Sequence, residues 1–431
     1  MRERLNGHWA ELRDSLWFLP ALITLACGLA AIATVRIDEG IRLSVGPVAT
    51  WLYAGGAEGA RGVLSAIAST MVNVTALVFS ITVVALQLAS SQLSPRVLRS
   101  FMADRGNQVV LGGFIGTFTY ALLTLRVVRS PLEERGGFVP AFSVTVAIVL
   151  ALASVGLLIY FIHHAANGMR GNVVMDRVAA VTIAAADRVA ADARTQANPA
   201  DGSGADAPSS ASAIDRSAAP AAIRADDAGC LRHADRNRLA KLAFGHAAAI
   251  RVLPRVGDFV LPGEPIALVW PASATDESFA DDVRAALVLW AERDANTDVA
   301  LGLTQLADIT IRALSAGIND PTTAIQGLDR LALVLAHLAR VWPDSGDPPD
   351  CALAPRVVVP LRPFDELAAL GFGTVVPHAA ADAAVSAHLA AVARRVAALA
   401  PPGRVPVLLA IAAAAERSIE REPSSNDPET R

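Results

Sequence analysis

One stretch of the sequence, residues 64–93, contains no charged side chain and is rich in leucine, valine and alanine. At a rise of about 1.5 Å per residue, a helix of this length exceeds the roughly 30 Å of hydrocarbon in a bilayer. The stretch is therefore predicted to cross a membrane as a tilted helix. The rest of the chain has to fold around this span.

The polar residues of this stretch fall on one side of the predicted helix. On a helical wheel of about 100° per residue, six side chains lie within roughly 80° of one another. These six, named here the polar stripe, are Ser65, Ser69, Asn73, Ser80, Gln87 and Ser91. An amide or hydroxyl without a partner in hydrocarbon costs several kcal/mol, so the polar stripe is expected to face protein or water rather than lipid.

Two interpretations of the polar stripe stay open. The first is adhesion between packed membrane helices, where serine and asparagine hydrogen bonds are common. The second is a water-filled path in an oligomer, in which Ser69, Asn73, Ser80 and Gln87 contact a permeating solute or ion. No charged residue or histidine lies inside the predicted spans, which argues against a proton- or charge-coupled pump.

Three more apolar segments predict three further spans. Together with the first they give a four-span domain over residues 1–167, with helices at about 16–35, 64–93, 109–125 and 139–162. The third span contains Gly112 and Gly116, a spacing that lets two helix backbones approach closely. This helix is expected to pack against another through its glycine face.

The remaining sequence predicts a second portion, so the fold class is an integral membrane α-helical unit followed by a cytosolic α+β portion that is mostly helical. Its parts are a connecting helix (168–196), a low-complexity linker (197–220), a small β-rich, β-barrel-like segment (221–271), a helical domain (272–420) and a disordered tail (421–431). The three isolated cysteines Cys27, Cys230 and Cys351 fit a reducing compartment better than a disulfide framework.

A polar motif in the helical domain forms the second candidate site. Its residues are Asp308, Arg312, Ser315, Gly317, Asn319, Asp320, Pro321 and Thr322. A tight corner between two helices accounts for them, with Gly317 left-handed after the first helix, Asp320 as N-cap and Pro321 in the first turn. Asp308 and Arg312, four residues apart, are expected to pair.

The alternative for this motif is a small anion or a nucleotide phosphate. Arg312, the hydroxyls of Thr322 and Thr323, and free N–H groups at the helix start would then hold the anion. The negative charge of Asp320 opposes this reading.

Three stretches carry a family resemblance: VFSITVVALQLASSQLSPRVLRSFMADRGNQVVLGGFIGTF, GDFVLPGEPIALVWP and LTQLADITIRALSAGINDPTTA. In this order they resemble the domain of unknown function 2254 family of bacterial membrane proteins. The resemblance implies a four-span inner-membrane protein with a cytoplasmic C-terminal portion, and it brings no established activity. The sequence departs from the family pattern at Ala316, where proline is more usual, and in the 197–220 insert.

The sequence contains no phosphate-binding Gly-x4-Gly-Lys loop, His-Glu-x-x-His, Gly-x-Ser-x-Gly or Cys-x-x-Cys motif, so no enzyme, metal or cofactor is predicted. A net charge of −4 without a basic run gives no reason to expect a nucleic-acid partner. The predicted function is an oligomeric, channel-like or transport-related protein of the bacterial inner membrane, with both termini in the cytoplasm. The alternative is a membrane-anchored sensor or scaffold whose cytosolic domain binds a ligand or a partner protein.

Overall fold

The structure is a computed structural model that describes residues 17–41, 53–92, 104–129, 138–168, 171–197, 219–343 and 356–420. The chain divides into two compact units, Met1–Val173 and Val174–Arg431, named here the membrane unit and the C-terminal unit. The predicted tail (421–431) and almost all of the predicted linker (197–220) lie outside the described residues.

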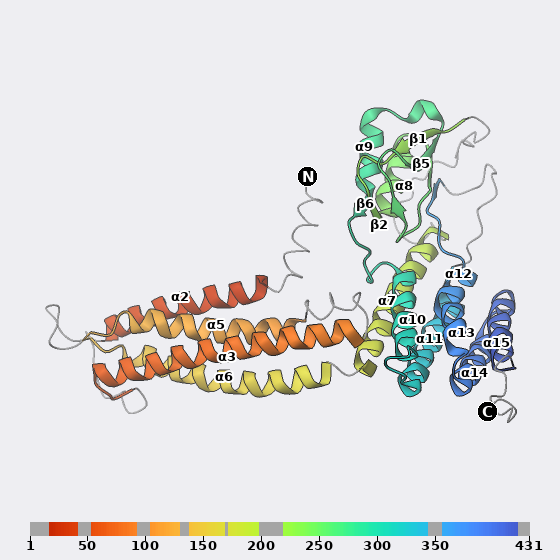
Figure 1. Cartoon of the computed structure of the whole chain (residues 1–431). Helices are drawn as coiled ribbons and strands as arrows, with labels where there is room; N and C mark the ends of the chain where they lie inside the picture. The colour runs from red at the N-terminus through yellow and green to blue at the C-terminus, as the bar shows by residue number, and fades with distance from the viewer. Residues whose placement is uncertain are drawn as a thin grey trace, which may run out of the picture. The chain divides into compact units, whose positions relative to one another are not determined.

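The membrane unit contains four long helices that lie side by side (Figure 1). They are α2 (Phe18–Ile41), α3 (Ala57–Gln92), α5 (Arg105–Leu125) and α6 (Ala141–Gly168). Each is long and apolar enough to cross a membrane, over Phe18–Gly40, Ala57–Val84, Arg105–Leu125 and Ala141–Ala165 respectively. The four predicted apolar helices are therefore confirmed.

Two of the helices extend beyond the predicted spans. Helix α2 continues past residue 35 through Asp38, and α3 begins at Ala57 rather than at residue 64. The candidate spans consequently include charged residues that the sequence-based spans left out. Hydropathy marks only the apolar middle of a membrane helix, whereas the hydrogen-bonded helix continues into the polar interface, where charged side chains reach water or helix ends.

Helix α5 is the central helix of this bundle, because it packs against α2, α3 and α6. Half of its most apolar window is buried, against 17–22% in the other three helices. A Cβ atom on Gly112 would lie 2.9 Å from the Cα atom of Pro20, and one on Gly116 would lie 2.7 Å from Sγ of Cys27. The close approach of α2 and α5 therefore depends on these two positions having no side chain.

The C-terminal unit contains two small sheets, each built from short strands. One has the order β1-β5-β3-β7 and the other the order β4-β2-β6. The strands are β1 (Ala221–Arg224), β2 (Gly229–Ala234), β3 (Ala249–Val252), β4 (Phe259–Val260), β5 (Pro265–Trp270), β6 (Leu287–Trp290) and β7 (Val357–Val358). All pairings are antiparallel except β3 with β7.

The predicted β-barrel-like segment is wrong in two respects. The described strands form two separate sheets and no closed barrel. They also extend beyond residue 271, because β2 pairs with β6 and β3 pairs with β7. Both added strands are too short for their alternation to identify them, and each is formed only through a partner distant in the sequence. Helices α8 (Arg236–Gly245) and α9 (Glu277–Ala286) pack against each other beside these strands.

The rest of the C-terminal unit is helical. Its elements are α7 (Gly171–Ala197, from Val174 onward), α10 (Val299–Ala313), α11 (Pro321–Val341), α12 (Phe364–Ala368), the π-turn η4 (Ala369–Gly373), α13 (Thr374–Ala379), α14 (Ala383–Leu399) and α15 (Val405–Glu420).

The predicted connecting helix, α7, is an integral part of this helical region. Its Thr182 packs against Gly302 of α10, where an added Cβ would lie 1.9 Å from the threonine hydroxyl oxygen. Two ion pairs join α7 to α11: Asp176 to Arg330 at 2.6 Å and Asp187 to His337 at 2.7 Å. Helix α10 thus packs along α11 and contacts α7 at Gly302.

Candidate functional site

The polar stripe lies on the exposed side of α3. The side chains of Ser65, Ser69, Asn73, Ser80 and Gln87 are all exposed, and that of Ser91 lies outside the described residues. The opposite side of α3 faces the bundle, where Leu64, Met71 and Val78 are buried. Among the described residues of the chain itself, the polar stripe therefore packs against no other helix.

The hydrogen bonding of the polar stripe is incomplete. The Ser69 hydroxyl donates to the carbonyl oxygen of Ser65 at 2.9 Å, which satisfies one hydroxyl within the helix. The amides of Asn73 and Gln87 make no side-chain hydrogen bond to any residue that the structure describes. An amide has two donor hydrogens and an acceptor oxygen, so each of these two side chains needs partners from outside the described residues.

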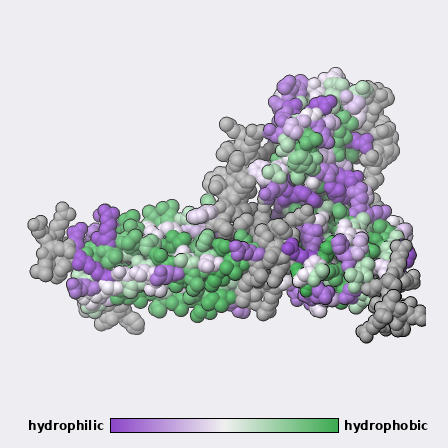
Figure 2. All heavy atoms as spheres, viewed as in Figure 1, coloured by the Kyte–Doolittle hydropathy of each residue, from purple (hydrophilic) through white to green (hydrophobic). Residues whose placement is uncertain are grey.

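Most of the remaining exposed surface of α3 is apolar. Val72, Leu77, Phe79 and Val84 are each between 46% and 59% exposed. Figure 2 shows that apolar residues cover most of the visible face of the membrane unit. This apolar surface suits lipid chains, whereas the polar stripe within it does not.

A buried polar cluster lies where α2 ends and α6 begins. The carboxylate of Asp38, which is 9% exposed, accepts hydrogen bonds from the backbone N–H groups of Phe142 (3.0 Å) and Ser143 (2.9 Å) and from the Ser143 hydroxyl (2.6 Å). The Tyr120 hydroxyl donates to the carbonyl oxygen of Ser143 at 3.2 Å and lies 2.7 Å from Oγ1 of Thr34. Asp38 thus satisfies the free N–H groups at the start of α6.

No local pattern in the sequence predicts this cluster. Asp38 and Ser143 are far apart in the sequence, and Asp38 lies past the predicted end of its span. The only sequence signal was the pair of carboxylates, Asp38 and Glu39, that follows an otherwise apolar segment.

At the other end of the bundle, Asp104 is the N-cap of α5 and accepts a hydrogen bond from the N–H of Gly106 at 2.8 Å. Oδ1 of Asp104 also lies 3.1 Å from Nε2 of His164, whose ring stacks on Tyr160. The contact of Asp104 with His164 therefore connects the start of α5 to the end of α6. The described residues contain no group of three or more histidine, cysteine or acidic side chains placed to bind a metal.

The motif of the C-terminal unit forms the corner between α10 and α11. Asp320 is the N-cap of α11 and accepts hydrogen bonds from the N–H (3.0 Å) and the hydroxyl (2.5 Å) of Thr323. These hydrogen bonds stabilise the carboxylate and lower the pKa of Asp320. Pro321 is the first residue of the helix, and the Ser315 hydroxyl donates to the Arg312 carbonyl oxygen at 2.7 Å.

The left-handed residue of this corner is Asn319, with φ 45°, and the prediction of a left-handed Gly317 is wrong. Asparagine tolerates this conformation because its short amide can bond to nearby backbone. Residues 315–319 are exposed, and Thr322 is exposed beside them. Capping and turn formation account for this geometry without a bound anion. The pairing of Asp308 with Arg312 stays a prediction.

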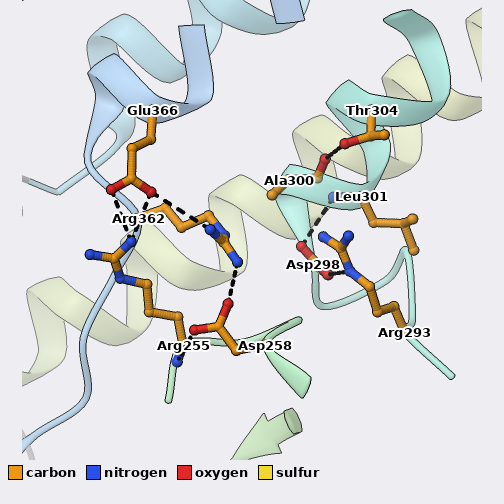
Figure 3. A network of polar contacts seen from close by, with 9 residues as sticks. All are labelled: Arg255, Asp258, Arg293, Asp298, Ala300, Leu301, Thr304, Arg362 and Glu366. Atoms are coloured by element: carbon orange, nitrogen blue, oxygen red, sulfur yellow. Dashed lines mark hydrogen bonds and ion pairs between the residues drawn. The ribbon is translucent and has the colours of Figure 1, made fainter. Parts of the chain in front are cut away.

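A network of ion pairs, which the sequence analysis did not predict, joins the strand region to α12 (Figure 3). Arg255 donates to Glu366 at 2.8 Å, and Arg362 donates to Asp258 and lies 3.6 Å from Glu366. Asp258 also accepts a hydrogen bond from the backbone N–H of Arg255 at 2.9 Å. The two arginines and two carboxylates balance in charge.

Beside this network, Asp298 is the N-cap of α10. Its side chain is only 2% exposed, accepts a hydrogen bond from the N–H of Leu301 at 3.0 Å and pairs with Arg293 at 2.6 Å. A cavity of about 40 Å³ next to it is lined by Thr297, Trp342 and Arg362, among others. This volume is room for a few water molecules.

Gly257 is the position at which the strand region touches this N-cap. Its φ is 91°, and an added Cβ would lie 2.2 Å from Oδ2 of Asp298. We expect Gly257→Ala to lower the free energy of unfolding by about 2–4 kcal/mol, because it combines left-handed strain with displacement of the Asp298–Arg293 pair. Gly263→Ala is the matched control, since φ is 80° there and nothing lies within 4 Å. The free energies of unfolding of both variants can be measured by urea titration. Gly263→Ala should lower this free energy by only about 1 kcal/mol. Equal losses in the two variants would contradict the role of this contact.

Four membrane-length apolar helices followed by a mostly helical unit with two small sheets define a polytopic membrane protein. The chain belongs to the family described as "Predicted membrane protein (DUF2254)", whose sequence model matches residues 13–395. It is 34% identical over 342 residues to two proteins described as uncharacterized, Rv1290c of Mycobacterium tuberculosis and Mb1321c of Mycobacterium bovis. The match covers 78% of this chain and 62% of each relative, so the chain spans less than two thirds of their length. No solved structure matches it.

Proposed function

We propose that several copies of this chain assemble in the bacterial inner membrane with their polar stripes facing a shared, water-filled path. Small polar solutes or ions cross the membrane along this path. The observation that carries the proposal is the exposure of Ser69, Asn73, Ser80 and Gln87 on the side of α3 that faces away from the bundle. In this arrangement both termini and the C-terminal unit lie in the cytosol.

Three environments are open to the polar stripe: lipid, another helix of the same chain, and water. If the stripe faced lipid, the unpaired amide of Asn73 alone would cost several kcal/mol. Facing another helix of the same chain is ruled out for the described residues, because that side of α3 is exposed. If the polar stripe faces water between copies of the chain, water satisfies all of its hydrogen-bond donors and acceptors. Leu77 and Phe79 then stay in contact with lipid.

The test is flux through the purified full-length protein in liposomes. We expect Asn73→Leu and Gln87→Leu each to lower solute or ion flux about tenfold or more, because leucine removes the hydrogen-bonding group and dewets the path. Thr70→Leu is the matched control. Thr70 is an exposed polar residue of α3 that lies about 60° beyond the edge of the polar stripe on the helical wheel. It should leave the flux unchanged.

Accessibility of single cysteines provides a second readout. With Cys27, Cys230 and Cys351 replaced, a cysteine at Asn73 should react with a membrane-impermeant thiol reagent about tenfold faster than a cysteine at exposed Leu77. Equal labelling rates at the two positions, or an absence of flux for every solute and ion tested, would overturn the proposal.

A further inference from the structure

The start of α3 adds one residue to the exposed side that carries the polar stripe. Helix α3 begins at Ala57, about two turns before its predicted start, and Glu58 lies in its first turn. On the same helical wheel, Glu58 lies about 20° from Ser65 and within the roughly 80° arc of the polar stripe. Its side chain is exposed. Glu58 and the polar stripe therefore share one side of α3.

Within the part of the chain that the structure describes, no neighbouring charge pairs with the Glu58 carboxylate on that side. No described residue forms an ion pair or hydrogen bond with Glu58. The nearest basic residue on α3, Arg61, lies about 60° around the wheel, is half-buried and donates to the carbonyl oxygen of Val128 at 3.0 Å. A favourable interaction with the helix dipole explains an acid in the first turn, but it does not require this side of the helix.

The depth of Glu58 in the membrane suits a charged group. At about 1.5 Å per residue, Glu58 and Gln87 lie roughly 44 Å apart along α3, and Asn73 lies midway between them. With Asn73 near the centre of a hydrocarbon core of roughly 30 Å, Glu58 and Gln87 both lie outside the core, one beyond each end of it. The Glu58 carboxylate therefore stays hydrated at one entrance of the path, whereas the interior of the path carries only hydroxyl and amide groups.

We infer that the path conducts small cations and that Glu58 is the residue that sets this preference over anions. The inference rests on the proposed function. In an assembly, one Glu58 from each copy forms a ring of carboxylates at the entrance, which raises the local concentration of cations and repels anions. The hydroxyl and amide oxygens of Ser69, Asn73, Ser80 and Gln87 then replace part of the hydration shell of the ion.

The test measures the reversal potential of the full-length protein in planar bilayers under a potassium chloride gradient. We expect the wild-type protein and Glu58→Asp to prefer potassium over chloride, Glu58→Gln to lower that permeability ratio about threefold or more, and Glu58→Lys to reverse the preference. Glu39→Gln is the matched control. Glu39 is an exposed acid in the last turn of α2, and its carboxylate lies 3.6 Å from the guanidinium of Arg36.

The outcomes separate this inference from the proposed function. Wild-type current with the same permeability ratio in Glu58→Gln and Glu58→Lys overturns the inference and leaves the path itself standing. A wild-type preference for chloride does the same. An absence of current in the wild-type protein overturns the proposed function and the inference together.

Discussion

Replacing Arg404 with alanine is expected to lower the free energy of unfolding of the C-terminal unit by about 3–5 kcal/mol. Arg404 is 9% exposed and donates to the carbonyl oxygens of Leu338 (2.9 Å), Ala339 (3.0 Å) and Trp342 (2.5 Å). These carbonyl groups lie at the end of α11. That of Leu338 also accepts a hydrogen bond from the N–H of Trp342 at 2.9 Å, whereas no further helical turn supplies N–H groups to those of Ala339 and Trp342. The guanidinium also lies over the ring of Phe364, with Cζ 5.2 Å from its centroid.

The large effect follows from burial. Hydrogen bonds from a charged donor contribute about 1.5–3 kcal/mol each, and alanine would leave the carbonyl groups of Ala339 and Trp342 without this donor. Lysine supplies a charge without the planar fork, so Arg404→Lys is expected to recover less than half of the loss.

The measurement is urea-induced unfolding of the full-length protein in detergent, followed by pulse proteolysis with detection of the C-terminal unit. Arg394→Ala is the control, because Arg394 is 58% exposed and pairs on the surface with Glu416. That pair should contribute less than about 1 kcal/mol. A loss for Arg404→Ala no larger than that of the control would show that the buried guanidinium does not hold the end of α11.

Replacing Asp38 with alanine is expected to lower the free energy of unfolding of the membrane unit by about 3–5 kcal/mol. The substitution removes the acceptor of three hydrogen bonds at the start of α6 and leaves the N–H groups of Phe142 and Ser143 unsatisfied. It also removes a negative charge from the positive end of the helix dipole. Asp38→Asn keeps one acceptor oxygen and is expected to lose about half as much.

The membrane unit can be unfolded by increasing sodium dodecyl sulfate in mixed micelles and followed by circular dichroism. Glu39→Ala is the control, since Glu39 is adjacent in the sequence, is 51% exposed and lies 3.6 Å from Arg36 in an exposed ion pair. We expect the control to change stability by less than about 1 kcal/mol. Asp38→Ala behaving like Glu39→Ala would contradict a capping role for Asp38.

The sequence predicted the four apolar helices because crossing a bilayer requires a length and an apolar composition that are both local properties. It also predicted the capping of α11, where Asp320 and Pro321 act within one turn of the chain. The same local reasoning assigned the left-handed position of that corner to Gly317. The structure has it at Asn319, since both residue types tolerate the conformation and only the path of the chain decides between them.

The sequence placed the polar stripe on one side of α3, because helical periodicity determines which residues share a side. It left open whether that side would be covered by another helix of the chain. That question depends on how four helices pack, and the structure answers it by burying the opposite side against α5 and α6. Glu58 could have been placed on the same wheel, but only a helix start at Ala57 makes it part of α3.

By itself, then, the sequence determined the membrane-spanning segments, the side of α3 that carries the polar stripe, and the N-cap of α11, since each follows from residues within a few turns of one another. Only the tertiary structure decided the contact of Asp38 with the start of α6, the burial of Arg404 against the end of α11 and the pairing of β6 and β7 with distant strands. These contacts join residues far apart in the sequence, and their energies come from burial and hydrogen bonds that exist only after the elements have packed.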